Sequence, residues 1–182
     1  MLLNTYASGR LAATVHGPRG TRKVSGPNLV VNVGLNGAVA VNTAEYPGAL
    51  GEVVRLAVGT SNTPPTPSDT ELGNMARNAL PTHSVRGTVS LTQRPGWAVA
   101  TYVETITFEP DGISRNYAEA GAFSTSQVTG AAARMSQRAL FRDELGAPTI
   151  VTVAGDEYLT VEWTTQLWRN LADQEFQIDV DG

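Results

Sequence analysis

Two histidines supply the imidazole groups in this sequence that could act as a catalytic base. His16 precedes Gly17-Pro18 and is predicted to lie in a turn, and His83 is predicted to lie in an exposed loop at a strand entry. A hydrolytic triad also needs a nucleophile and an orienting acid, and no Gly-x-Ser-x-Gly motif is present. We therefore expect no catalytic residue and no enzyme. A hydrolase that brings together distant carboxylates such as Glu104 and Glu162 is the remaining enzymatic alternative.

The acidic residues do not form a pattern that would bind a metal ion. Asp69 and Glu71 are two positions apart, but prolines and threonines flank them and no other ligand is near. Asp143-Glu144 and Asp156-Glu157 are adjacent pairs, whose side chains would point to opposite faces of a strand. The sequence has no cysteine, and Gly34-Leu35-Asn36-Gly37 lacks the pattern of a nucleotide-binding loop. We expect no metal and no cofactor.

Three tryptophans could form a platform on which sugar rings stack. Trp163 lies on the apolar face of an alternating segment, so we expect it in the core. Trp168 falls on the opposite face of that segment and is the aromatic residue best suited to an interface. The full set of candidate interface residues is Pro64, Pro65, Pro67, Trp97, Arg142 and Trp168.

Length and composition describe a single domain that can fold without a metal or a disulfide. The chain has 182 residues, of which 41% are hydrophobic and only 16% charged, and its net charge is −4. Its one basic run, Arg19 to Lys23, is too short to neutralise several phosphates, so we expect no nucleic-acid partner. Met1 to Tyr6 lacks the features of a signal peptide, and no apolar run approaches the ~20 residues of a membrane span. We expect synthesis in a cytoplasm and no membrane association.

Alternation of polar and apolar residues predicts the elements that must position these side chains. The fold class that we expect is mainly β, an antiparallel β-sandwich with one or two short helices in the N-terminal half. Residues 53–58, 84–92 and 159–168 alternate with period two, and Trp97 to Phe108 is a longer strand with bulky side chains on both faces. In the second of these segments, one face is expected to carry Val85, Gly87, Val89 and Leu91.

Glycine and proline mark the connections. Residues 60–68 form an extended Pro-rich loop, either a connection within one domain or an arm that lies on a neighbouring subunit. Asn28 to Asn42 fits a hairpin or a short helix that begins after Pro27, and we favour the helix. A second short helix is predicted to begin at Ser68 or Asp69.

The domain organisation that follows is one β-rich domain over residues 1–182. Residues 1–26 are a candidate N-terminal arm and residues 170–182 a candidate C-terminal arm. In the latter, Phe176 to Val180 alternates apolar and polar residues, and could add a strand to this chain or to a neighbour.

A succession of short motifs runs through residues 27–168. In chain order these are Pro27-Asn28-Leu29-Val30-Val31-Asn32-Val33-Gly34-Leu35, Arg55-Leu56-Ala57-Val58-Gly59-Thr60, the Thr/Pro loop, Asp69-Thr70-Glu71-Leu72, Tyr117-Ala118-Glu119-Ala120-Gly121-Ala122-Phe123, Ala139-Leu140-Phe141-Arg142 and Leu159-Thr160-Val161-Glu162-Trp163. This order resembles a diffuse set of tailed-bacteriophage structural proteins, which are found among tail-fibre, tail-tip, baseplate and capsid-decoration components.

The resemblance implies a non-enzymatic virion protein. Its partners would be copies of itself, in a homo-oligomer, and other virion proteins, and its location would be a tail or baseplate appendage or the decorated capsid. The alternative function is a carbohydrate-binding or adhesin module of a phage appendage, with a host-surface glycan as a partner. Catalytic motifs are not part of the resemblance.

Overall fold

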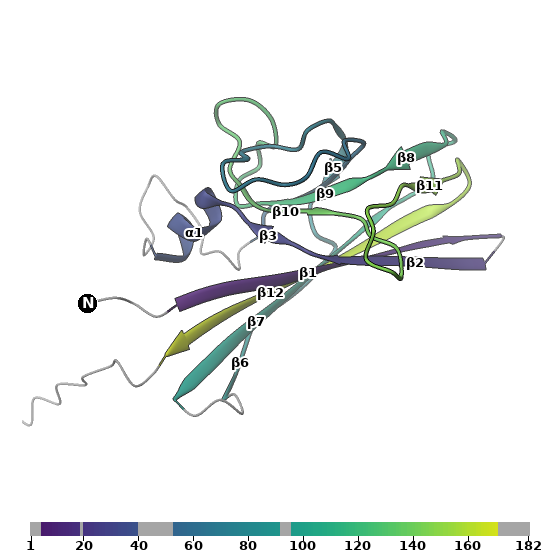
Figure 1. Cartoon of the computed structure of the whole chain (residues 1–182). Helices are drawn as coiled ribbons and strands as arrows, with labels where there is room; N and C mark the ends of the chain where they lie inside the picture. Colours follow the sequence, from purple (N-terminus) through teal and green to yellow (C-terminus); the bar gives the residue numbers. More distant parts are fainter. Residues whose placement is uncertain (1–4, 19, 40–52, 92–95, 171–182) are drawn as a thin grey trace, which may run out of the picture.

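The computed structural model describes residues 5–18, 20–39, 53–91 and 96–170, and these form two antiparallel sheets that pack face to face (Figure 1). The long sheet consists, in spatial order, of β2 (Gly20–Pro27), β1 (Thr5–Gly17), β12 (Tyr158–Asn170), β7 (Trp97–Phe108) and β6 (His83–Leu91). The short sheet consists of β3 (Leu29–Val30), β10 (Met135–Leu140), β9 (Glu119–Phe123), β4 (Arg55–Gly59) and β5 (Met75–Ala79). A two-stranded sheet pairs β11 (Val151–Val153) with β8 (Arg115–Tyr117), and the helix α1 (Asn32–Val39) follows β3.

The main core lies between the facing surfaces of the two sheets. Small side chains on β9 and β10 belong to the same buried cluster as large side chains on the long sheet, so that the two surfaces interdigitate. Burial of each large side chain contributes roughly 1.5–3 kcal/mol to folding. The core residues of the two sheets are Leu11, Ala13, Val15, Ile106, Phe108, Leu159, Val161, Trp163, Leu56, Val58, Ala120, Ala122 and Ala139.

Loops cover the other face of the short sheet. A second buried cluster there is formed by Ala57, Leu72, Phe123, Val128, Ala133 and Met135. Gly121 permits this packing, because a Cβ atom at its position would lie 2.9 Å from Leu72 Cδ2 and 2.9 Å from Met135 Sδ. The strand β9 is therefore buried on both faces, and all of its residues are buried.

The long sheet extends past the short sheet at one end. β1 and β12 have 13 residues each and β7 has 12, whereas β4 and β9 have 5 each. At about 3.3 Å per residue, the long strands reach more than twice as far as the short ones. The uncovered part, residues 5–8, 97–101 and 166–170, is called the projecting end below, and Figure 1 shows it running away from the sandwich beside α1.

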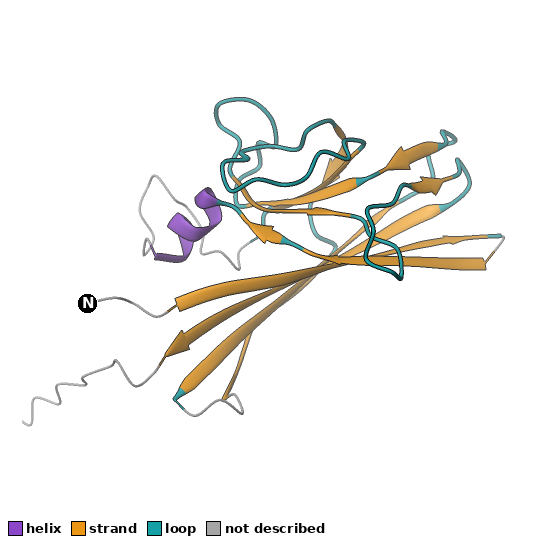
Figure 2. Cartoon of the chain, in the orientation of Figure 1, coloured by secondary structure: helices purple, strands orange, loops and turns teal. Residues whose placement is uncertain are grey.

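Several sequence predictions are confirmed. The fold is mainly β with antiparallel sheets, and Figure 2 shows strands and loops with one short helix in the described part of the chain. β7 has the predicted limits, and Ile106 and Phe108 share its buried face. The helix favoured after Pro27 is present, but it begins at Asn32 because Leu29 and Val30 first pair with β10.

Three sequence predictions are wrong. Residues 5–26 are not an arm, because β1 lies between β2 and β12 in the long sheet and β2 forms an edge of it. No helix begins at Ser68 or Asp69, because Asp69 closes a turn by accepting hydrogen bonds from Thr66. The uninterrupted alternation predicted from Ser84 onwards is broken in the backbone, because the pairing of β6 with β7 shifts register between Val85 and Thr88. The candidate C-terminal arm beyond Asn170 lies outside the described residues.

Candidate interaction surfaces

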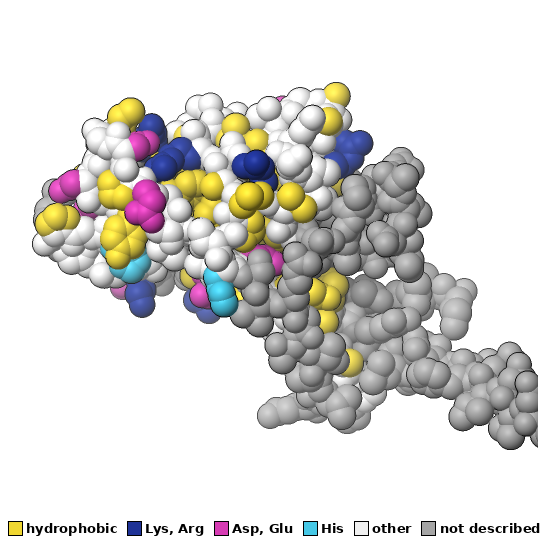
Figure 3. All heavy atoms as spheres, turned by 180° about the vertical axis from the view of Figure 1, so that it is seen from behind, with side chains coloured by type: hydrophobic (Ala, Val, Ile, Leu, Met, Phe, Trp, Pro, Cys, Tyr) yellow, Lys and Arg dark blue, Asp and Glu magenta, His cyan; other side chains and the backbone are white. Residues whose placement is uncertain are grey.

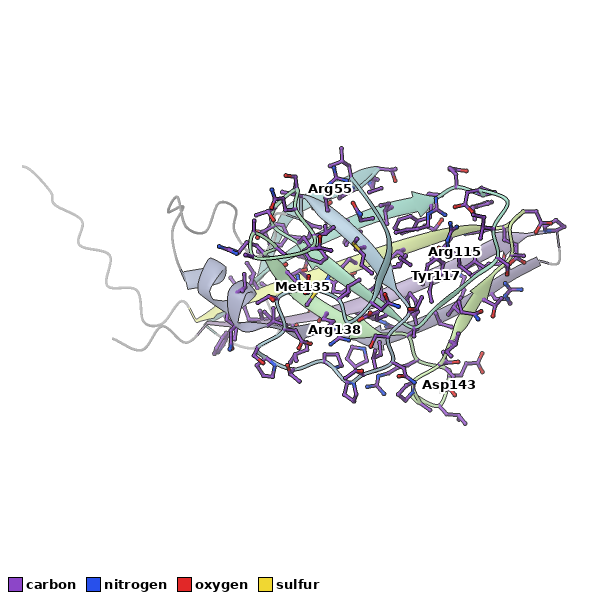
Figure 4. The ribbon with its side chains drawn as sticks, turned by 90° about the horizontal axis from the view of Figure 1, so that it is seen from above. Arg55, Arg115, Tyr117, Met135, Arg138 and Asp143 are labelled. Atoms are coloured by element: carbon purple, nitrogen blue, oxygen red, sulfur yellow. The ribbon has the colours of Figure 1, made fainter. Side chains whose placement is uncertain are left out.

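Three charged residues meet where the segment between β4 and β5 lies against the short sheet. This segment, residues 60–74, begins with the Pro-rich residues 60–68, and the whole of it is called the Pro-rich loop below. Arg138 on β10 places Nη2 2.7 Å from Glu119 Oε2 on β9, and Nη1 2.6 Å from Asp69 Oδ2 in the loop. Arg138 and Glu119 are 3% and 0% exposed. Figure 4 shows Arg138 within the body of the molecule. These residues form a buried ion cluster that joins two strands of the short sheet to the loop.

The ion cluster holds both ends of the Pro-rich loop. Glu119 accepts hydrogen bonds from the amides of Ser61, Gly73 and Asn74, at donor–acceptor distances of 3.3, 3.2 and 3.0 Å. Arg138 Nη2 also donates to the Thr63 carbonyl oxygen at 3.1 Å. The loop is thus a connection between β4 and β5 that lies against the chain's own sheet. Of its candidate interface residues, Pro64 and Pro67 are exposed and Pro65 is half-buried.

The cluster shifts the pKa values of two of its members. Burial alone would raise the pKa of Asp69, but hydrogen bonds from Thr66 and Arg138 and the Arg138 charge hold that pKa below its ordinary value. Burial would lower the pKa of Arg138, but its bonds and proximity to Asp69 and Glu119 raise it. Asp69 is therefore ionised at neutral pH and tied to a permanent cation.

The tryptophans occupy two different environments. Trp163 is fully buried, as predicted, and its indole Nε1 donates to Gln137 Oε1 at 3.0 Å. Gln137 in turn donates to Thr165 Oγ1 at 2.7 Å, so a hydrogen-bonded cluster crosses from one sheet to the other. Trp97 and Trp168 both lie half-buried on the outward face of the projecting end, where Trp168 Nε1 donates to Ser8 Oγ at 3.4 Å.

Arg142 begins a loop that crosses the edge of the long sheet. We call residues 142–149 the edge loop, and Figure 4 shows Asp143 on it, out beyond the strands. The Ser25 amide on β2 donates to the Arg142 carbonyl oxygen at 3.4 Å, and Arg142 Nη1 donates to the Gly146 carbonyl oxygen at 2.7 Å. The loop exposes Leu145, a large apolar side chain that is 94% accessible to solvent. This residue adds an exposed apolar contact point that the sequence did not single out.

The acidic and imidazole side chains that could act in catalysis do not lie together in the described part of the chain. The enzymatic alternative pairs Glu104 with Glu162, but the two lie on opposite faces of the long sheet. Glu104 is paired with the core residue Trp163, and Glu162 is the residue before Trp163 on β12, so its side chain points the other way. His16 lies in β1 rather than in a turn, and its ring stacks on Tyr158 at a centroid distance of 4.6 Å. His83 is exposed at the start of β6, as expected.

Charged side chains of both signs also lie on the surface. Figure 3 shows one face of the molecule, on which Lys and Arg side chains are interspersed with Asp and Glu. Among the described residues, no group of three or more His, Asp or Glu side chains could hold a metal ion. In that same part of the chain, no helix has the length and apolar character needed to cross a membrane.

The ion cluster is the feature that sequence analysis missed. The sequence points to Asp69 as a helix start or a weak metal ligand, and gives no sign that it pairs with Arg138 or lies near Glu119. A usable signal was present, because Glu119 and Arg138 each interrupt a short run of small and apolar residues in a segment that has strand character. Compared with known proteins, the chain matches no family model, no curated protein and no solved structure.

Proposed function

We propose that this chain is a non-enzymatic structural protein of a tailed-phage virion, which assembles with copies of itself and with other virion proteins. The observation that carries the proposal is the projecting end. A sheet with one solvated face normally alternates apolar and polar side chains. Here the outward face carries the half-buried Trp97 and Trp168 around the buried Val99, while the inward face carries the half-buried Ala100 and Leu167. Apolar residues on both faces of an extension favour burial against another chain.

The resemblance to phage structural proteins supports the same conclusion. Its motifs are spread over more than a hundred residues, yet those around Arg55, Glu119 and Ala139 lie on the adjacent strands β4, β9 and β10. The Asp69 motif joins them through the ion cluster. We infer that these motifs hold the sandwich rigid. The sandwich would then present the projecting end, the Pro-rich loop and the edge loop to partners in a tail or baseplate appendage or on the capsid.

Light scattering coupled to size exclusion tests self-assembly. The full chain is expected to have an oligomeric mass, and Trp168→Arg is expected to lower that mass towards one subunit, because it places a charge in the apolar contact. Ile113→Arg is the matched control: Ile113 is 57% exposed and follows β7 at the end opposite to Trp97, so its replacement should leave the mass unchanged. A strictly monomeric full chain at high concentration would contradict the proposed self-assembly.

Mass spectrometry of purified particles tests the virion location separately. Tailed-phage particles whose genome encodes the chain are expected to contain it in a fixed stoichiometry with the other structural proteins. Its absence from washed particles would contradict a virion role, whatever the oligomeric mass of the isolated chain.

A further inference from the structure

Three adjoining hollows surround the side chain of Arg10 on the outward side of β1. The largest has a volume of about 370 Å³ and lies between β1, β2 and the edge loop. The second, of about 280 Å³, shares Arg10, Ser25 and the first residues of the edge loop with it. The third, of about 230 Å³, continues onto β12 and is lined by Ser8, Gly9, Arg10, Thr164 and Gln166. Together we call them the Arg10 groove.

Strand register explains why these side chains share one surface. Ser8 and Arg10 lie opposite Gln166 and Thr164 in the β1–β12 pairing, and paired residues of antiparallel strands project to the same face. The edge loop closes the far side of the groove where it crosses β2. Gly26 permits this approach, because a Cβ atom there would lie 2.8 Å from the Leu140 carbonyl oxygen.

The lining combines cations with neutral hydrogen-bonding groups. Arg10, Lys23 and Arg142 supply three positive charges, and the hydroxyl and amide side chains are those of Ser8, Thr14, Ser25, Thr164 and Gln166. Arg10 Nη2 donates to Ser25 Oγ at 3.2 Å. Arg10 and Lys23 are both exposed, so the N–H groups of these two side chains that face solvent can donate to an anionic ligand.

The edge loop also contributes two acidic residues, Asp143 and Glu144, so the cations of the lining exceed its carboxylates by one. Asp143 Oδ1 accepts hydrogen bonds from the amides of Leu145 and Ala147, at 3.0 and 2.9 Å, so this carboxylate is used to shape the loop. Glu144 is exposed and can accept hydrogen bonds from ligand hydroxyl groups. Trp168 adds an aromatic ring beside the third hollow through its hydrogen bond to Ser8.

We propose that the Arg10 groove binds an oligosaccharide that carries carboxylate groups. The cations would pair with the carboxylates, and the serine, threonine and glutamine side chains would bind the sugar hydroxyls. The groove crosses β12, β1 and β2, so that its occupant meets side chains. A peptide could not add as a strand to β2 here, because the edge loop occupies that edge at Ser25, whose amide donates to the Arg142 carbonyl oxygen. The site lies on one chain and goes beyond the proposed structural role; its third hollow includes Ser8 and Gln166 of the projecting end, so it requires an assembly that leaves this part of the outward face open.

Nuclear magnetic resonance with tetragalacturonic acid tests this assignment. Addition of the saccharide to the full chain is expected to shift the amide signals of Gly9, Ser25 and Gly146, which line the groove. The fully methyl-esterified tetrasaccharide keeps the hydroxyls but loses the charge, and should bind at least about tenfold more weakly. Equal binding of the ester would overturn the role of the cations, and unshifted groove amides would overturn the site.

Matched variants locate the binding. Arg10→Gln should weaken the affinity for tetragalacturonic acid about tenfold, and Gln166→Ala should weaken it by a smaller factor. Arg134→Gln is the control, since within the described residues its guanidinium donates to the carbonyl oxygens of Ala131 and Ala133, and it lies outside the groove. Equal effects of Arg10→Gln and Arg134→Gln would refute the assignment. So would groove shifts produced by a peptide of sequence 171–182 but not by the saccharide, which would make the groove a contact between chains.

Discussion

Replacement of Arg138 by methionine should destabilise the chain strongly. The substitution removes the bonds of the guanidinium to Glu119 at 2.7 and 2.9 Å, to Asp69 at 2.6 Å and to the Thr63 carbonyl oxygen at 3.1 Å. Removal of one partner from a buried ion pair typically costs about 3–5 kcal/mol, because the other charge stays buried. Glu119 retains three backbone amide donors, which places the expected loss near the lower limit, at about 3 kcal/mol.

Urea unfolding followed by circular dichroism measures this loss. Arg134→Met is the matched control, because in the described part of the chain Arg134 donates to two backbone carbonyl oxygens and to no carboxylate, and the substitution should cost no more than about 1 kcal/mol. The double variant Arg138→Met with Glu119→Gln should lose less than the sum of the single losses, since it leaves no unpaired buried charge. A free energy of unfolding for Arg138→Met within about 1 kcal/mol of the original, or strict additivity in the double variant, would refute this account of the ion cluster.

Two further variants test the ion pair of Asp69 and the packing around Gly121. Because the pKa of Asp69 is lowered in the folded chain from its ordinary value of 3.8, its carboxylate stabilises the fold above that value and loses this effect as the pH falls through the folded pKa. The stability difference between the original chain and Asp69→Asn, measured by urea unfolding, should be constant above about pH 5 and shrink below about pH 3.8; a difference independent of pH would contradict the ion pair. Gly121→Ala should cost about 1–3 kcal/mol in the same assay, because its methyl group would press against Leu72 and Met135. An unchanged free energy of unfolding would contradict this prediction, because it would mean that Leu72 and Met135 can move aside at little cost.

The sequence predicted those elements whose residues alternate against a single buried face. β7 and β12 were identified because apolar side chains such as Ile106 and Trp163 recur every second position, and this pattern is local. The pairing of β1 with β12 joins Leu11 to Trp163, more than a hundred residues apart. Such pairing leaves no local signal, which is why the sequence alone predicts an arm for the N-terminal segment.

The ion cluster could not be predicted for a related reason. Asp69 follows a Pro-rich segment and resembles a helix cap, but its partners Thr66 and Arg138 hold it in a turn. The cluster depends on Glu119 and Arg138 lying on adjacent strands, which only the tertiary structure determines. The outward position of Trp168 follows from the sequence, because this residue falls on the polar face of a strand whose other face is core.

Cross-linking through single cysteines tests most directly whether the projecting end joins subunits. The natural sequence has no cysteine, so each introduced thiol is unique. Thr101 and Thr160 lie on the same outward face of the long sheet, the first at the projecting end and the second near the opposite end. With a short bis-maleimide reagent, Thr101→Cys is expected to give covalent dimers in high yield and Thr160→Cys to remain monomeric. Equal yields from the two variants, or no dimer from Thr101→Cys, would contradict assembly through this surface.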